Sequence, residues 1–345
     1  MRSRGRRTVG AVRSLLAALG LVAVVLPLSG ATAGASGPAP VPSRPSAGCS
    51  LTHPAAPGTA NLLLDAGGDQ GSYERQIPPT YTGRKPLPVV IDLHGYSEPA
   101  TLQETLTQLG TYGDSHGFIT VTPQVTYTVP MWDTTLGSKD LAFIGGLLGT
   151  VDSTLCADRN RIFVTGYSDG AFMTSSIACQ FAGQVAAVAP VAGIEDPSGC
   201  HPTRRVPVVA FHGTADPFVS YTGGLGPASL KLPAPDGSGK TIGQELGSKA
   251  PPKTPSIPAN TATWAKRNGC TARPHDTRIA SDVTLISYAC PSDDNVELYR
   301  IAGGGHAWPG SVFSKSIESV IGRVTFSISA NQIIWKFFQA HPRRG

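Results

Sequence analysis

Ser168 has the residue type and the local setting that nucleophilic acyl transfer requires. It stands in Gly166-Tyr167-Ser168-Asp169-Gly170, a G-x-S-x-G pattern between an apolar run (161–165) and a helical pattern (171–181). This strand–turn–helix setting is typical of a nucleophile elbow, in which a tight turn exposes a serine hydroxyl at the positive end of a helix. Because a serine hydroxyl is a poor nucleophile until a base removes its proton, we expect a base elsewhere in the chain.

The expected base is His306. In chains with this elbow the acid and the base follow the serine, and five histidines do so, namely His201, His212, His275, His306 and His341. Of these five, His306 is the one preceded by three glycines, which suits a tight loop over a crowded site. His212 is better explained by the end of a strand. A base must be neutral, so hydrolysis should decline as the pH falls below about 6–7.

The acid expected to orient His306 is Asp216. It lies in the loop that leaves the carboxyl end of the apolar run 206–211, and functional groups of open α/β sheets gather at the carboxyl ends of strands. Its role is to accept the Nδ1 proton of His306 and to stabilise the imidazolium. Four other aspartates remain open as alternatives: Asp196, Asp282, Asp293 and Asp294.

Acyl transfer also requires donors for the developing oxyanion, and loss of one donor typically costs about 10²–10³ in rate. One expected donor is the backbone N–H of Asp169, next to the nucleophile. The other is the N–H of Tyr96, in the loop after the apolar run 87–93. Trp132 and Trp308 are candidates for flat apolar walls of a substrate pocket, with core packing as the alternative for each.

Strand and helix patterns alternate around these residues. Apolar runs predict strands at 87–93, 118–122, 161–165, 185–191 and 206–211, and helical spacing predicts helices at 101–115, 141–155 and 171–181. A capping box, Ser329–Gln332, opens a last helix with Ile334, Phe337 and Phe338 on one face. This alternation predicts one domain with a mainly parallel central sheet and helices on both faces. The Gly/Pro-rich stretch 221–260 predicts a surface insertion, with a disordered excursion as the alternative.

The charge of the chain is concentrated at its N-terminus. Of 28 basic residues, five lie in residues 1–35 with no acid, so residues 36–345 hold 23 basic and 23 acidic residues. The five arginines flank the start of an apolar run, Leu15–Leu28, which ends at small residues suited to cleavage. We therefore expect a signal peptide at 1–35, a disordered Pro/Ser/Gly-rich linker at 36–48 and a catalytic domain at 49–345. An uncleaved anchor is the alternative, but the run is shorter than the roughly 20 residues of a membrane span.

The near-neutral remainder gives no reason to expect a nucleic-acid partner, or a membrane partner after signal cleavage. All six cysteines lie in this remainder, and an even number in an exported chain predicts three disulfides, whose pairing stays open among 15 possibilities. Spacings typical of metal ligands, phosphate loops or dinucleotide sites do not occur in the sequence. We expect a secreted, extracellular monomer that needs neither metal nor cofactor.

Taken together, these motifs resemble a known family, the secreted polyhydroxybutyrate depolymerase-like and feruloyl esterase-like α/β-hydrolases of the carbohydrate esterase family 1 type. The matching stretches are Val89–Gly95, Cys156–Cys179, Val206–Pro217, Trp264–Cys270, Gly303–Gly310 and Ile334–Phe338. The resemblance implies an α/β-hydrolase fold and a serine carboxylic ester hydrolase with Ser168, Asp216 and His306 as its triad. It also implies hydroxycinnamoyl, acetyl or hydroxyalkanoate ester substrates, either small molecules or linked to polysaccharide or polyester.

The resemblance further implies the disulfides Cys49–Cys156, Cys179–Cys200 and Cys270–Cys290. Two features depart from the family. The stretch from Tyr221 to Asn260 is long and lies between acid and base, and the chain ends soon after Phe338 without the binding module typical of depolymerases of solid polyester. The insertion lies where it can reshape the pocket, and the absence of that module favours soluble or polysaccharide-linked esters. Three alternatives remain open: a polyhydroxybutyrate oligomer depolymerase, a cell-envelope acyltransferase with the same triad, and a non-catalytic binding protein.

Overall fold

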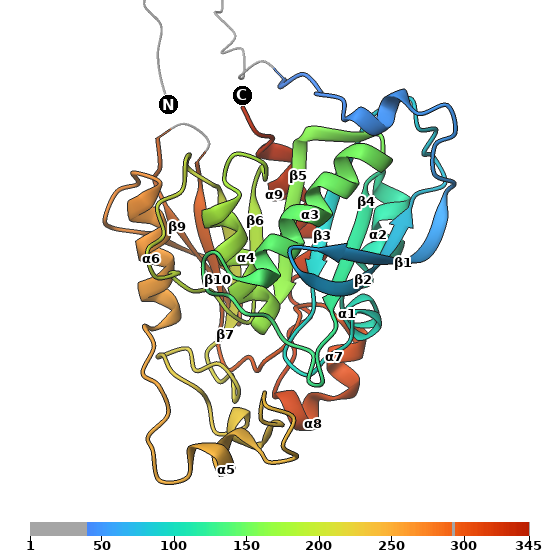
Figure 1. Cartoon of the computed structure of the whole chain (residues 1–345). Helices are drawn as coiled ribbons and strands as arrows, with labels where there is room; N and C mark the ends of the chain where they lie inside the picture. Colours follow the sequence, from blue (N-terminus) through green and yellow to red (C-terminus); the bar gives the residue numbers. More distant parts are fainter. Residues whose placement is uncertain (1–39, 292–293, 345) are drawn as a thin grey trace, which may run out of the picture. The chain divides into compact units, whose positions relative to one another are not determined.

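The computed structural model describes residues 40–291 and 294–344. This part of the chain is built around a ten-stranded sheet (Figure 1). Its strands lie in the order β1-β2-β4-β3-β5-β6-β7-β10-β9-β8. Their bounds are β1 Gly58–Ala66, β2 Asp69–Ile77, β3 Leu87–Leu93, β4 Ile119–Val125, β5 Ala157–Tyr167, β6 Val188–Val191, β7 Val208–Gly213, β8 His275–Ala280, β9 Val283–Tyr288 and β10 Val296–Ile301.

The centre of the sheet is parallel, from β4 through β3, β5, β6 and β7 to β10. Every residue of β7 is buried, as are the last five residues of β3, which explains why both strands read as continuous apolar runs in the sequence. Antiparallel strands extend the sheet at both ends, β2 and β1 beside β4, and β9 and β8 beside β10. The predicted mainly parallel sheet is confirmed.

Helices cover both faces of this sheet. In Figure 1, α3, α4 and α6 lie in front of the strands and α9 lies behind them. Each face has its own buried apolar cluster, one containing Leu147, Ile177 and Trp264, the other Leu109 and Phe338. The bounds of the helices are η1 Ala47–Ser50, α1 Ala100–Thr107, α2 Leu109–His116, α3 Lys139–Thr154, α4 Asp169–Gln180, η2 Ser229–Lys231, α5 Ile242–Leu246, α6 Ile257–Arg267, α7 Val312–Ser316, α8 Glu318–Ile321 and α9 Ala330–Ala340.

Several elements differ from the sequence prediction in their extent. β5 extends beyond the predicted 161–165 at both ends, and β6 begins three residues later than predicted. The expected helix 101–115 is two helices, because Gln108 between them adopts a left-handed conformation with φ 52°. The expected strand 118–122 continues through Pro123 to Val125. Proline is tolerated there because β4 pairs with β3 only as far as Val121 and with β2 alone beyond it.

The N-terminal part of the described chain is not the free linker that its composition predicts. Pro45 forms a bridge with Asp158 at the start of β5, and the Ser46 N–H donates to the Ala157 carbonyl at 2.9 Å. Proline has no N–H group, and an extended segment at the edge of a sheet uses only some of its N–H groups for pairing. A proline-rich composition is therefore compatible with this ordered segment as well as with a disordered linker. The predicted linker therefore ends no later than Val41, and the predicted signal peptide lies outside the described residues.

The predicted insertion carries structure of its own. It contains η2 and α5, and α5 begins with a capping box formed by Thr241 and Gln244. The Tyr96 hydroxyl donates to the Pro233 carbonyl at 2.8 Å, so the insertion contacts the loop that follows β3. In Figure 1 it lies beside the lower edge of the sheet, where the parallel strands end. α6 begins within the predicted range, at Ile257.

Three disulfides fasten loops to this framework: Cys49–Cys156, Cys179–Cys200 and Cys270–Cys290. This is the pairing that the resemblance implies. Among the described residues, none of the helices has the length and apolar character needed to cross a membrane.

Candidate active site

Ser168 occupies the sharp turn between β5 and α4. Its backbone has φ 56° and ψ −114°, a strained conformation for a residue with a side chain. The Ser168 N–H donates to the Val191 carbonyl at 2.9 Å, and its own carbonyl accepts the first N–H bonds of α4 from Ala171 and Phe172. The strain is thus held in place by the neighbouring strand and the helix, as a nucleophile elbow requires.

The two glycines of the elbow are required by close backbone contacts. A Cβ at Gly166 would lie 2.3 Å from the Gly170 carbonyl oxygen, and a Cβ at Gly170 would lie 2.2 Å from the Leu93 carbonyl oxygen. These distances exclude any side chain at either position. They also show that the elbow lies directly against the end of β3, whose following loop carries Tyr96.

His306 and Asp216 meet at the same edge of the sheet. His306 Nδ1 lies 2.7 Å from Asp216 Oδ2, and both side chains are at least 95% buried. The other carboxylate oxygen, Oδ1, accepts the N–H groups of Phe218 and Val219 at 2.8 and 2.9 Å. Burial alone would raise the pKa of Asp216, but the charge and hydrogen bond of His306 outweigh it, so the pKa lies below the ordinary value. An ionised Asp216 fixes the His306 tautomer with the Nδ1 proton toward the carboxylate.

Two aromatic residues, Tyr167 and Phe218, contact His306 and help to fix its position. The rings of Tyr167 and Phe218 lie 4.8 and 5.0 Å from its imidazole, measured between ring centroids. The Tyr167 hydroxyl donates to the His306 carbonyl at 2.6 Å. Tyr167 immediately precedes Ser168, so one residue of the elbow also positions the loop that carries the imidazole.

His212 is a contact of Asp216 that the sequence analysis did not identify. It lies in β7 as expected, but its Nε2 lies 3.3 Å from Asp216 Oδ2 and 2.9 Å from the Val219 carbonyl. Burial lowers the pKa of His212, so the ring is neutral and its Nε2–H donates to these oxygens. The spacing of four residues between His212 and Asp216 was visible in the sequence, but their contact depends on how the loop after β7 turns back.

The other candidate aspartates that the structure describes are paired with arginines instead of His306. Asp196 pairs with Arg267, Asp282 with Arg323, and Asp294 with Arg205, while Asp293 lies outside the described residues. Among the remaining downstream histidines, His201 and His275 are exposed and His341 accompanies α9 near the C-terminus.

The Tyr96 and Asp169 N–H groups, the expected oxyanion donors, make no hydrogen bond to other described residues. The Asp169 N–H is at the start of α4, where backbone donors point out of the helix. The Tyr96 loop is held by its neighbours, since Gly95 N–H donates to Glu98 Oε2 at 3.2 Å and Ser97 N–H to the Pro130 carbonyl at 2.6 Å. Two free donors on adjoining loops suit an oxyanion site.

Glu98 is a further residue that the sequence analysis did not single out. Burial raises its pKa, while the nearby His306 and the hydrogen bond from Gly95 act to lower it. A Cβ at Gly95 would lie 2.6 Å from Glu98 Oε2 and 3.2 Å from the Tyr167 ring. A carboxyl group thus lies between the proposed oxyanion loop and the residues around His306.

Trp132 and Trp308 are only 3% and 1% exposed, which favours core packing over pocket walls for both residues. Trp308 packs in the core with its Nε1–H bonded to Asn331 Oδ1 at 2.8 Å. Trp132 lies under the Tyr96 loop, where its Nε1–H donates to the His94 carbonyl and its N–H to Asp169 Oδ2. Both tryptophans therefore support the loops around the site.

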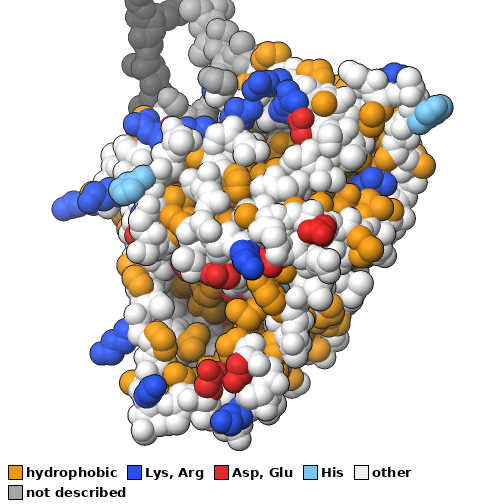
Figure 2. All heavy atoms as spheres, viewed as in Figure 1, with side chains coloured by type: hydrophobic (Ala, Val, Ile, Leu, Met, Phe, Trp, Pro, Cys, Tyr) orange, Lys and Arg blue, Asp and Glu red, His pale blue; other side chains and the backbone are white. Residues whose placement is uncertain are grey.

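A pocket of about 210 Å³ lies between the insertion, α4 and the loop after β6. It is close to the elbow, because a Cβ at Gly193 would touch both the Ser168 carbonyl and the ring of Phe172, which lines the pocket. Its other lining residues include Ile194, Glu195, Val219, Leu225, Ile257 and Asn260. Figure 2 shows apolar side chains in a hollow of this face, above the part of the chain that carries α5.

The four segments that carry these groups follow parallel central strands. Tyr96 follows β3, Ser168 follows β5, Asp216 follows β7 and His306 follows β10. Carboxyl ends of parallel strands meet at one edge of the sheet, which is where open α/β sheets bind their ligands. Within the described residues, no group of three His, Cys, Asp or Glu side chains is placed to hold a metal ion. Sheet, elbow and helix arrangement define an α/β-hydrolase fold.

Comparison with known proteins gives the family. No protein-family model matches the chain. Feruloyl esterase B of Piromyces equi is 30% identical over 243 residues, covering 67% of this chain and 42% of the relative. The bifunctional acetylxylan esterase/xylanase XynS20E of Neocallimastix patriciarum is 29% identical over 134 residues, covering 39% of this chain and 20% of the relative. The chain therefore spans less than half the length of these two relatives.

A solved acetyl xylan esterase from Aspergillus awamori superposes with a TM-score of 0.49 at 15% identity, covering 76% of this chain and 99% of that one. The fold assignment rests on the strand order described above. The chain belongs to the feruloyl esterase- and acetylxylan esterase-like α/β-hydrolases of the carbohydrate esterase family 1 type, at about 30% identity.

Proposed function

We propose that this protein is an extracellular serine carboxylic ester hydrolase. The observation that carries the proposal is the buried His306–Asp216 pair at the sheet edge where the strained Ser168 elbow lies. A strained serine, an oriented imidazole and two free N–H donors are the parts that acyl transfer requires. Three disulfides and the export signal expected at residues 1–35 support an extracellular location.

In the proposed mechanism, His306 Nε2 accepts the Ser168 proton while the Ser168 oxygen attacks the ester carbonyl. Asp216 stabilises the imidazolium, and the Tyr96 and Asp169 N–H groups stabilise the oxyanion. The imidazolium then protonates the leaving alcohol, which leaves an acyl-enzyme. His306 takes a proton from water as the water oxygen attacks the acyl-enzyme. The imidazolium then returns this proton to the Ser168 oxygen as the acyl–oxygen bond breaks, which releases the acid and restores the Ser168 hydroxyl.

The proposed substrates are feruloyl or acetyl esters of polysaccharides, as in the names of the relatives. The pocket beside the insertion offers a site for the acyl group, because it is close to Ser168 and has apolar walls. Turnover of methyl ferulate, acetylated xylan and hydroxybutyrate oligomers, compared at equal enzyme concentration, tests this assignment. Faster turnover of hydroxybutyrate oligomers than of both other substrates would contradict it.

The direct test of the reaction is the Ser168→Ala variant. Turnover of p-nitrophenyl acetate should fall at least about 10³-fold, because the nucleophile is removed while the fold is kept. Ser153→Ala, which changes an exposed serine at the end of α3, should match the wild type. If Ser168→Ala keeps the wild-type rate, the proposed mechanism is wrong.

A further inference from the structure

A second cavity lies at the opposite end of β5 from Ser168. Its volume is about 360 Å³, and the residues that line it come from the N-terminal segment, α3, the first half of β5, the loop after α4 and the C-terminal tail. β5 has 11 residues, so at about 3.3 Å per residue the cavity lies roughly 30 Å from the nucleophile elbow. The proposed ester hydrolysis makes no use of this cavity.

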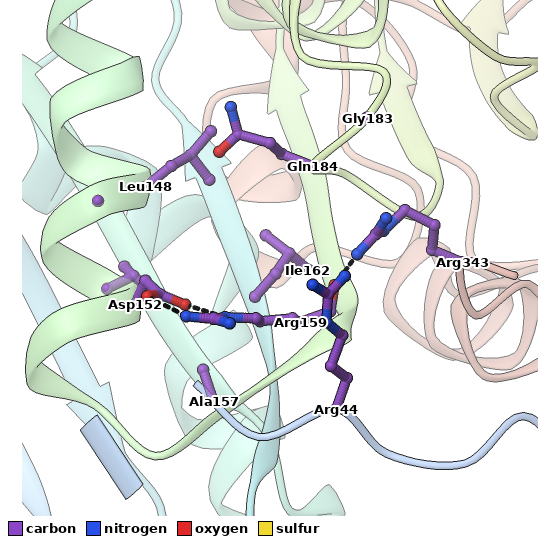
Figure 3. Close-up of a pocket in the computed structure, with 11 residues that line it drawn as sticks. Arg44, Leu148, Asp152, Ala157, Arg159, Ile162, Gly183, Gln184 and Arg343 are labelled. Carbon is purple, nitrogen blue, oxygen red and sulfur yellow. Dashed lines mark hydrogen bonds and ion pairs between the residues drawn. The ribbon is translucent and has the colours of Figure 1, made fainter. Parts of the chain in front are cut away.

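Three arginines line the cavity, and their side chains are shown in Figure 3. Arg44 belongs to the segment before η1, Arg159 to β5, and Arg343 to the tail after α9. Asp152 is the one acidic residue of the lining. Three positive charges and one negative charge leave this cavity with a formal charge of +2.

Two of the arginines are held in place by the fold. Arg159 makes a two-point ion pair with Asp152. Arg343 Nη2 donates to the Arg159 carbonyl at 3.3 Å, and the Arg343 N–H donates to the Asn160 carbonyl at 2.8 Å. The Nε of Arg343 is buried without a hydrogen-bond partner. Donor groups are therefore fixed in position before any ligand arrives, which lowers the entropic cost of binding.

Arg44 carries the unbalanced charge. Its backbone is fixed, because its N–H donates to Asp158 Oδ1 at 2.9 Å and its carbonyl accepts the Arg159 N–H at 2.8 Å. Its guanidinium makes no hydrogen bond or ion pair with other described residues, and in Figure 3 it extends toward Arg343. Burial, followed by the positive charge of Arg44, lowers the pKa of Arg343. Like charges that face each other are destabilising unless an anion lies between them.

We infer that this cavity binds an oxyanion group, through Arg44, Arg343 and the remaining donors of Arg159. Guanidinium groups bind phosphate and carboxylate oxygens through paired N–H donors, so both chemistries fit the site. The group belongs either to a phosphate or to the carboxylate of an acidic sugar. This inference is independent of the proposed hydrolytic function.

Isothermal titration at constant ionic strength tests the inference, with sodium phosphate and sodium glucuronate as probes and glucose as the neutral control. The wild type and Ser168→Ala should bind at least one of the two anions saturably, with a dissociation constant of roughly millimolar or below, and should not bind glucose. Tighter binding of phosphate would indicate a phosphate-bearing ligand, and tighter binding of glucuronate an acidic sugar.

Arg44→Gln should weaken binding at least about tenfold, and Arg343→Gln should do the same. Arg44→Gln is the cleaner variant because its side chain makes no contact that the fold needs. Arg84→Gln removes an exposed arginine before β3 and should bind like the wild type. The three arginine variants should hydrolyse p-nitrophenyl acetate at the wild-type rate, which shows that they are folded. Absence of saturable binding to both anions, or wild-type affinity in Arg44→Gln, would overturn the inference.

Discussion

The residues of the proposed triad differ in how each is held. Ser168 is held by backbone strain between β5 and α4, whereas His306 is held by Asp216, Tyr167 and Phe218. Asp216 itself accepts two backbone N–H groups on the oxygen that His306 does not use. Most of the fixed geometry thus comes from neighbours that take no direct part in the proposed reaction.

The triad residues could be predicted from the sequence, whereas several of these neighbours could not. Ser168, Asp216 and His306 are each recognisable because a short motif surrounds them. Glu98 and His212 have no such motif, since their importance lies in contacts between separate loops. Both tryptophans follow the alternative of core packing, because a position in the sequence, even the two-residue separation of Trp308 from His306, does not decide which way an aromatic ring packs.

Glu98 offers a test of how the Tyr96 loop is held. In Glu98→Gln the side-chain oxygen can still accept the Gly95 N–H, whereas Glu98→Ala removes this acceptor. We therefore expect Glu98→Ala to lower turnover of p-nitrophenyl acetate about fivefold or more, and Glu98→Gln to keep most of it. Asp65→Asn, on the exposed face of β1, is the control and should match the wild type. Wild-type turnover in Glu98→Ala would contradict this role.

At the scale of elements, strands β3 to β7 of the parallel centre were predictable, whereas β10 and the antiparallel strands at the two ends were not. Strands such as β3 and β7 are buried on both faces, so their apolar runs are plain in the sequence. β1 alternates between half-buried and exposed residues, and β8 is almost entirely exposed. Such strands are stabilised mainly by pairing with neighbouring strands. This pairing does not require an apolar run, so the sequence carries little signal that predicts these strands.

The β3–α1 contact contains a buried carboxyl group. Asp92 at the end of β3 is fully buried, and its two oxygens accept hydrogen bonds from Gln103 Nε2 at 2.6 Å and Thr107 Oγ1 at 2.7 Å. Burial raises the pKa of Asp92 to about 8. The folded state therefore binds a proton that the unfolded chain releases near pH 4, so this group lowers stability as the pH rises from about 4 to about 8.

We expect Asp92→Asn to reduce this loss of stability with pH. The free energy of unfolding of the wild type should fall between pH 5 and pH 8, with Asp92 contributing at most about 1.4 kcal/mol per pH unit. Gln103 Oε1 is buried without a partner, so the Gln103 amide can turn to accept a hydrogen bond from the introduced side-chain N–H group. Urea unfolding at both pH values measures the effect, with Asp65→Asn as control. An equally steep pH dependence in Asp92→Asn would refute this assignment.

At the scale of the whole molecule, the two edges of the sheet carry different groups. The proposed reaction uses the carboxyl edge of the parallel strands, whereas the arginine-lined cavity is at the amino edge. Residues 36–345 have equal numbers of basic and acidic residues, so this positive cavity reflects arrangement and not composition. In the sequence, the overall net charge pointed only to the expected export signal.

The disulfides stabilise this arrangement to different degrees. Cys49–Cys156 closes a separation of 107 residues, while Cys270–Cys290 closes one of 20. In the chain-entropy model a loop of about 100 residues contributes about 4.7 kcal/mol and one of about 15 residues about 3 kcal/mol. The double variant Cys49→Ser/Cys156→Ser should therefore lower the melting temperature more than Cys270→Ser/Cys290→Ser. The reverse order, measured by differential scanning calorimetry, would contradict this expectation.

The central claim is that Ser168 is a nucleophile activated by His306, and active-site labelling tests it most directly. A fluorophosphonate should add once per chain, and peptide mapping by mass spectrometry should locate the adduct on Ser168. The adduct should be absent in Ser168→Ala and should form far more slowly in His306→Ala, where the base is missing. An adduct on a different residue, or an unlabelled wild type that still hydrolyses p-nitrophenyl acetate, would contradict the claim.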